Sequence, residues 1–74
     1  MRRMCIVMRS FEAKQYCREP LKFESFLVGE RVVFLRPQDE HTLFVRELDI
    51  GSADPYIVDE ETFESSTAPV PDNA

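Results

Sequence analysis

Residues 31–48 read RVVFLRPQDEHTLFVREL, and this stretch decides the fold class. It holds two runs of β-branched and aromatic residues, Arg31–Arg36 and Thr42–Leu48, on either side of the polar residues Gln38–His41. Pro37 is expected to end the first run, because a proline lacks the amide hydrogen that a sheet ladder needs. Two such runs joined by a short polar loop predict an antiparallel β-hairpin.

The residues before the hairpin predict two more strands. Met4–Phe11 is largely apolar and has no glycine or proline, so a strand covered on both faces is expected there. Leu21–Val28 begins with the alternation of a half-buried strand, which slips at Ser25-Phe26 as it would at a β-bulge or a strand-to-loop change. Between them, Glu12–Glu19 has helix-forming residues and ends at Pro20, which predicts a short helix or an irregular connection.

The residues after the hairpin predict shorter elements. Residues 49–55 combine Gly, Ser, Asp and Pro and predict a turn, and residues 56–58 predict a short strand. Asp59 is placed to cap a single helical turn, whose Phe63 would come back onto the core. We therefore expect one β domain over residues 1–64, followed by a flexible C-terminal tail over residues 65–74.

Together these elements predict a mainly β fold. We expect a small curled antiparallel sheet or barrel of four to five strands, with one short helix or helical turn and a flexible acidic tail. A chain of 74 residues is long enough for one small domain. The central strands carry apolar side chains on both faces. In a single flat sheet, the few remaining residues could not shield both of these faces from water. Either the sheet curls into a barrel, or one face pairs with a second copy or a partner.

The step FLVGERVVF at residues 26–34 resembles the strand entry of SH3-like small barrels. Residues 56–58 with the helical turn after them resemble the end of such barrels, so the resemblance covers residues 21–63. It implies a small barrel, and SH3-like barrels serve as peptide binders, nucleic-acid binders and assembly adaptors. The chain has no tryptophan, so recognition of proline-rich peptides is not expected. The small size and the tail also resemble, in style, the accessory proteins of phages and mobile elements.

Charge is divided unevenly along the chain. Residues 1–46 carry all nine Lys and Arg and six acidic residues, a net charge of +3. Residues 47–74 carry eight acidic residues and no basic ones, a net charge of −8. Such a segment favours a basic protein surface, or the basic half of the same chain, and it repels a nucleic-acid backbone. The simplest alternative is a charged segment that only keeps the protein in solution.

From this division we expect a non-enzymatic protein-binding module, an adaptor or inhibitor. Its acidic surface, residues 47–64, would dock onto a basic site of a larger protein, such as one that handles nucleic acid. The expected partner-binding residues are the acidic ones of that segment: Glu47, Asp49, Asp54, Asp59, Glu60, Glu61 and Glu64.

Two other functions compete with acidic docking. The first is nucleic-acid binding through hairpin arginines, with aromatic rings stacking on bases; the residues are Arg31, Arg36, Arg46, Phe34 and Phe44. Against it, the same arginines are expected to pair with carboxylates at the sheet edges, and the phenylalanines are expected to be core; the carboxylates are Glu24, Glu30 and Glu47. The second is a structural homodimer that buries an apolar sheet face.

Catalysis, metal binding and a cofactor are not expected. His41, beside Asp39, is a candidate general base, but the sequence shows no motif that sets a nucleophile or an acid to act with it. Cys17, beside Arg18, is more simply a semi-buried thiol than a reactive one. With Cys5 these residues exhaust the soft metal ligands, and no zinc-site spacing occurs. No apolar run is long enough to span a membrane or to form the core of a signal peptide, so a cytoplasmic location is expected.

Overall fold

The computed structural model describes residues 3–16, 22–51 and 54–71. In these residues seven strands form one antiparallel sheet with the order β3-β2-β6-β5-β4-β1-β7. A 3-10 turn, η1 (Glu47–Asp49), follows β5, and one helix, α1 (Glu60–Ser66), lies between β6 and β7. No helix within these ranges has the length and apolar character that crossing a membrane requires. The strands are β1 (Arg3–Val7), β2 (Phe11–Gln15), β3 (Phe23–Phe26), β4 (Arg31–Gln38), β5 (His41–Arg46), β6 (Tyr56–Asp59) and β7 (Thr67–Pro69).

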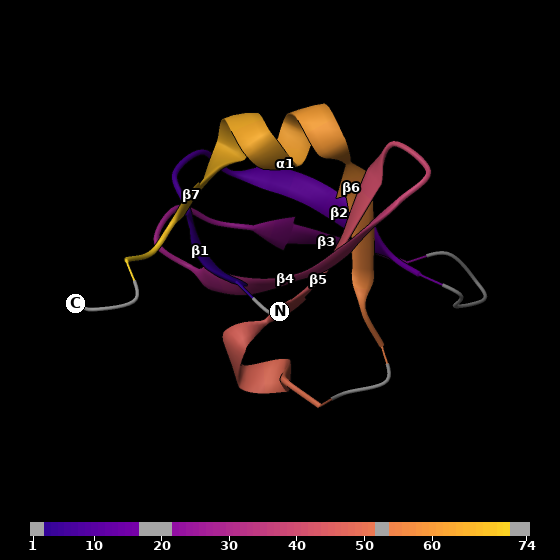
Figure 1. Cartoon of the computed structure of the whole chain (residues 1–74), viewed down its shortest axis with the longest axis horizontal. Helices are drawn as coiled ribbons and strands as arrows, with labels where there is room; N and C mark the ends of the chain where they lie inside the picture. Colours follow the sequence, from indigo (N-terminus) through magenta and orange to yellow (C-terminus); the bar gives the residue numbers. More distant parts are fainter. Residues whose placement is uncertain (1–2, 17–21, 52–53, 72–74) are drawn as a thin grey trace.

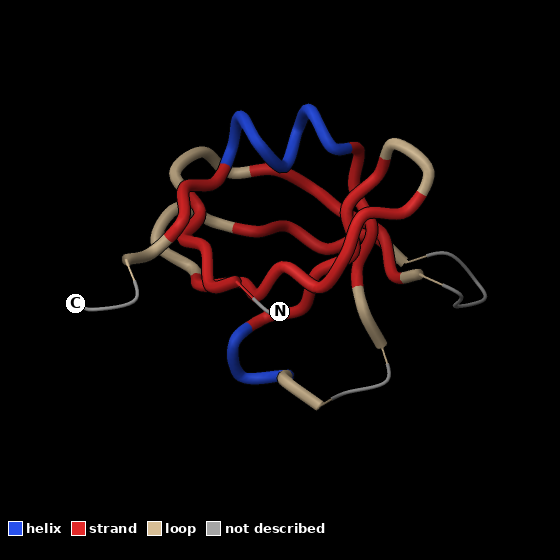
Figure 2. The backbone as a smooth tube through the Cα atoms, in the orientation of Figure 1, coloured by secondary structure: helices blue, strands red, loops and turns tan. Residues whose placement is uncertain are grey.

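The sheet curls on itself into a half-barrel (Figure 2). The helix α1 lies over one side of the curl, and η1 projects from the opposite side (Figure 1). The prediction of a mainly β fold with a small curled antiparallel sheet is therefore confirmed, although the sheet has seven strands rather than four to five. The two additional strands are β2, which lies where a short helix or connection was expected, and β7, which lies in the expected tail.

The inside of the curl is an aromatic core. The Phe26 ring lies 5.3 Å from Phe11, 5.1 Å from Phe44 and 5.0 Å from Tyr56, measured between ring centroids. From α1, Phe63 lies 5.3 Å from Phe44, as its predicted return to the core requires. Such ring pairs stabilise a core beyond the area that they bury. The cluster of buried residues consists of Cys5, Val7, Phe11, Ala13, Phe26, Val32, Phe44, Tyr56 and Phe63.

The predicted helix or irregular connection over Glu12–Glu19 is wrong for its first part. Residues Phe11–Gln15 form β2, and residues 17–19 lie outside the described ranges. In β2 the side chains of Phe11 and Ala13 are buried, while those of Glu12 and Lys14 are exposed. The strand pairs with β3 on one side and β6 on the other, so packing against distant segments outweighs the local helix preference.

The predicted hairpin is confirmed as the pair β4–β5, with a tighter turn than expected. The strands continue to the pair Gln38↔His41, so the loop has two residues, Asp39 and Glu40, rather than four. Their φ angles are 48° and 64°, and positive φ at both central residues defines a type I′ turn. Pro37 lies inside β4, opposite Thr42, and the pairing of β4 with β1 that the described residues show extends to Phe34.

This turn predicts that Glu40→Gly raises stability. A residue with a side chain is strained at a φ of 64°, whereas glycine is not. We expect a gain of about 0.5–1 kcal/mol, after allowance for the freer unfolded chain. Thermal unfolding should show this as a rise in Tm of about 5 °C. The control is Glu40→Ala, which removes the same charge but keeps the β-carbon; an equal rise in that variant would contradict the explanation.

Two details of the outer strands also differ from expectation. The register of β3 with β2 is unshifted as far as the pair Phe11↔Phe26. The slip in the hydrophobic pattern at Ser25-Phe26 therefore marks the end of the strand and not a bulge. A register shift does occur in the β4–β5 pair, between Phe34 and Arg36. The side chain of Phe23 points outward and is 65% exposed. This orientation follows from the register, which places Phe26 and Glu24 on the inner face.

The segment after β6 is more ordered than predicted. Asp59 caps α1 as expected, accepting a hydrogen bond from the Thr62 amide at 3.0 Å, but the helix has seven residues, about two turns rather than one. The expected flexible tail over residues 65–74 contains the end of α1 and the strand β7, which pairs with β1 through Cys5↔Pro69. Residues 72–74 lie outside the described ranges.

Candidate functional site

Six carboxylates lie on the β4–β5 turn and along α1, and we call this set the acidic end. Two belong to the β4–β5 turn, three to the cap and first turn of α1, and one, which lines a pocket with Arg3, to the second turn of α1: Asp39, Glu40, Asp59, Glu60, Glu61 and Glu64. The two segments are joined by the backbone, because the Glu60 amide donates to the Glu40 carbonyl oxygen at 3.1 Å. The turn residues Asp39 and Glu40, which sequence reasoning left out, therefore belong beside the predicted residues of α1.

The acidic end has little internal compensation for its charge. None of its six carboxylates forms an ion pair with a residue in the described part of the chain. The Thr62 amide, hydrogen-bonded to the Asp59 carboxylate, is the main reason why the pKa of Asp59 lies below its ordinary value; nearby His41 adds to the effect. His41 itself is exposed, and its Nδ1 lies 2.8 Å from the Asp39 carbonyl oxygen. Within residues 3–16, 22–51 and 54–71, no group of three His, Cys, Asp or Glu side chains could hold a metal ion.

The other predicted partner-binding residues lie elsewhere. Glu47 and Asp49 are part of η1, on the opposite side of the sheet from α1 (Figure 1). Asp54 lies in the connection before β6. Residues 47–64 therefore do not form one continuous surface. The sheet divides them into the acidic end around α1 and a separate region around η1, a division that their adjacency in sequence does not reveal.

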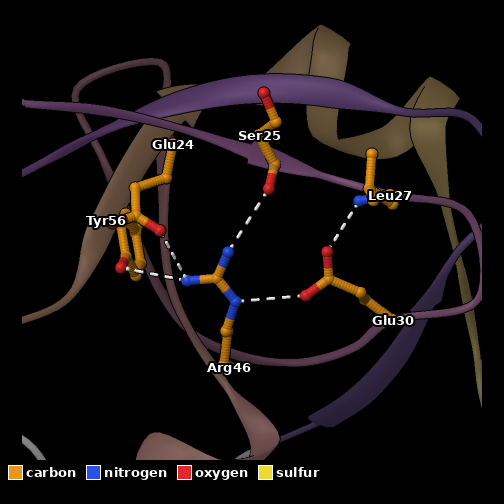
Figure 3. A network of polar contacts seen from close by, with 6 residues as sticks. All are labelled: Glu24, Ser25, Leu27, Glu30, Arg46 and Tyr56. Atoms are coloured by element: carbon orange, nitrogen blue, oxygen red, sulfur yellow. Dashed lines mark hydrogen bonds and ion pairs between the residues drawn. The ribbon is translucent and has the colours of Figure 1, made fainter.

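Arg46, at the end of β5, is the centre of a polar network (Figure 3). Its Nε donates to Glu30 Oε1 at 3.1 Å, and its Nη1 donates to Glu24 Oε1 at 3.0 Å and to the Tyr56 hydroxyl at 3.1 Å. Its Nη2 donates to the Ser25 carbonyl oxygen at 3.3 Å. The guanidinium carbon also lies 4.3 Å from the centroid of the Phe26 ring, within the range of a cation–π contact.

This network covers part of the outer edge of β3, which is an end strand of the sheet. In an antiparallel pair every second residue of a strand bonds to its partner strand. The Gln15 amide donates to the Lys22 carbonyl oxygen, so Lys22, Glu24 and Phe26 are the residues of β3 and its entry that face β2. The Ser25 carbonyl and the Leu27 amide therefore point away from β2. Arg46 binds the carbonyl, and Glu30 Oε2 accepts from the Leu27 amide at 2.7 Å. An unpaired edge is a template for aggregation, and here two side chains occupy it.

Within the network, Arg46 and Glu30 each favour the charged form of the other. The hydrogen bond from the Leu27 amide is the main reason why the pKa of Glu30 lies below its ordinary value; burial opposes this shift and Arg46 supports it. Burial alone would lower the pKa of Arg46, but its hydrogen bonds to Glu30 and Glu24 outweigh burial, and the pKa is raised. The positively charged guanidinium of Arg46 is therefore paired with two carboxylates, those of Glu24 and Glu30.

The hairpin arginines do not form a joint basic face. Arg46 is bound in the network, and Arg31 lies 3.9 Å from Glu47, so the predicted pairing with Glu24, Glu30 and Glu47 is confirmed. Arg36 donates to the side chain of Gln38. The rings proposed for base stacking are also engaged: Phe44 is fully buried, and Phe34 packs against the core with the Arg3 guanidinium 5.1 Å from its centroid.

Among the residues that the structure describes, the soft ligands Cys5 and His41 belong to no group that could hold a metal ion. Cys5 is buried and carries a free thiol, and burial is the main cause of its raised pKa. Cys17 lies outside the described ranges.

Comparison with protein-family models, with curated proteins and with solved structures finds no match for this chain, so any function has to be argued from the arrangement of its own residues.

Proposed function

We propose that this protein is a non-enzymatic protein-binding module, an adaptor or inhibitor, that docks through its acidic end onto a basic site of a larger protein. The observation that carries the proposal is a contrast between two parts of the surface. Arg46 and Arg31 are paired with carboxylates, whereas the six carboxylates of the acidic end are not paired with any residue in the described part of the chain. Carboxylates left unpaired in this way attract a basic partner and speed its encounter.

The position of the acidic end supports the same role. A tight turn and a capped helix hold its backbone, so the carboxylates are presented on fixed elements rather than on a loose segment. The partner's basic site would be of the kind that otherwise binds phosphates, as in a protein that handles nucleic acid. The resemblance of residues 21–63 to SH3-like barrels agrees with an adaptor, because such barrels include assembly modules.

The test neutralises three carboxylates of α1 in one variant, Glu60→Gln, Glu61→Gln and Glu64→Gln. The control neutralises two acidic residues outside the acidic end: Asp49→Asn and Asp54→Asn. Tagged protein is used to recover host proteins after nuclease treatment, and affinity for the recovered partner is then measured with purified proteins. We expect the first variant to bind about tenfold or more weakly, with slower association, and the control to bind like the wild type.

Two results would overturn this proposal. One is a partner that the α1 variant and the wild type bind equally well. The other is recovery of nucleic acid alone, or of a protein that nuclease treatment removes, since either would assign the binding to the arginines instead.

A further inference from the structure

A second surface lies on the side of the molecule opposite α1. Here a groove of about 340 Å³ runs between the start of β4 and η1, and its lining residues are Gly29, Glu30, Arg31, Arg46, Glu47 and Leu48. We call this region the η1 face. Leu48 projects from its edge and is 93% exposed, a value that an isolated leucine side chain in water would approach. Val28 and Leu27, which lead into Gly29, are more than half exposed as well.

The charges of the η1 face cancel. Glu30 and Glu47 balance Arg31 and Arg46, so the lining is neutral, whereas the whole chain carries a net charge of −5. Two copies that approach through their acidic ends repel each other, whereas two copies that meet through the η1 face repel less, because the exposed Asp49 is the one charge of η1 outside the neutral lining. This face is therefore the place where the molecule can contact another copy of itself at low electrostatic cost.

The η1 face is also complementary to itself. It carries a projecting apolar side chain, Leu48, directly beside a groove, which is what a two-fold contact requires of a single patch. Its loose ion pair, Arg31–Glu47, has an N···O distance of 3.9 Å and both side chains well exposed. A two-fold axis that passes between Arg31 and Glu47 would bring Arg31 of one copy opposite Glu47 of the other, and the charges would then match across the contact.

We propose that two copies of this chain associate through the η1 face. Leu48 of each copy enters the groove of the other, and Arg31 of each copy pairs with Glu47 of the other. Because a standard interface takes about 800 Å² from each partner, and the apolar part of this face is small, a weak dimer with a micromolar dissociation constant is expected. The acidic ends lie away from this contact and stay free.

The test is sedimentation velocity of the full chain over concentrations from below to well above the micromolar range. We expect the wild type to shift from monomer to dimer as concentration rises. Leu48→Asp should raise the dissociation constant by about tenfold or more, since it places a charge at the apolar centre. The matched control is Phe23→Asp, which also replaces an exposed apolar residue, on β3 outside the groove, and should leave the dimer intact.

A charge exchange tests the geometry itself. Arg31→Glu alone and Glu47→Arg alone each place like charges across the two-fold contact, so each variant should be monomeric. An equimolar mixture of the two should form a mixed dimer, because positions 31 and 47 then carry opposite charges across the contact while each chain still holds like charges within itself. A wild type that stays monomeric throughout, a dimer that Leu48→Asp leaves unchanged, or a mixture that stays monomeric would each overturn the proposal. None of these outcomes involves the acidic end, so the proposed function is judged separately.

Discussion

Replacement of Phe26 with alanine is expected to remove most of the stability of this domain. The Phe26 ring is fully buried and lies within 5.0–5.3 Å of the rings of Tyr56, Phe44 and Phe11. Truncation of a buried phenylalanine costs about 3–5 kcal/mol, through lost transfer energy and the cavity left behind. A domain of 74 residues has about 4–11 kcal/mol in total. Chemical denaturation followed by circular dichroism should therefore show a variant that is largely or wholly unfolded.

The same strand supplies the control for this prediction. Phe23 lies three residues before Phe26 but points outward, so Phe23→Ala should change the free energy of unfolding by no more than about 0.5 kcal/mol. Equal losses in the two variants would contradict the assignment of faces in β3, and with it the register of β2 against β3.

Arg46→Met is expected to cost about 2 kcal/mol of unfolding free energy. The variant keeps an unbranched side chain over Phe26 but leaves Glu24, Glu30 and the Ser25 carbonyl without their donor. The cost stays below that of a fully buried pair, because the side chains of Glu24 and Glu30 are about one third exposed and solvent screens their charges. Urea unfolding measures the loss, and Arg36→Met, which removes an exposed arginine of the same hairpin, should change little.

The pH dependence separates loss of the network from a general packing defect. The folded-state pKa of Glu30 lies below its ordinary value of 4.5, so ionisation of Glu30 stabilises the fold above that pH. This stability is lost as the pH falls from 4.5 through the lowered pKa of the folded state. In Arg46→Met the Leu27 hydrogen bond remains but the guanidinium is gone, so the loss over this pH range should be smaller than in the wild type. Parallel pH profiles in the two proteins would contradict a role for Arg46 in holding Glu30 ionised.

The sequence was sufficient to predict the fold class because its strongest signals are local. Two apolar runs around a polar turn indicate the hairpin β4–β5, and the place of Asp59 before two glutamates indicates the start of α1. The strand β2 was not predictable in the same way. Its residues favour a helix locally, and they become a strand only because Phe11 and Ala13 pack against segments far along the chain.

The candidate site was predictable in its charge but not in its extent. The run of acidic residues after Arg46 is plain in the sequence, whereas its division by the sheet depends on η1 and α1 leaving on opposite sides. The contribution of Asp39 and Glu40 depends on a two-residue turn that brings Glu40 to the amide of Glu60. The pairing of Arg46 with Glu24 and Glu30 was open to prediction from composition, but its place on the free edge of β3 follows only from the strand order.

The pairing of β1 with β7 has a consequence for the way in which the chain folds. The ladder contact Cys5↔Pro69 joins residues 64 positions apart, so the sheet cannot be completed until almost the whole chain has been gathered. The hairpin β4–β5 closes within microseconds on its own and is the natural nucleus, whereas β1 has only β4 to dock against until β7 arrives. Folding should therefore be slow for so small a domain, in the range of about milliseconds to seconds that is typical of small barrels dominated by distant contacts. The Val70 amide, which donates to the Met4 carbonyl oxygen across this pairing, should accordingly acquire exchange protection later than the hairpin.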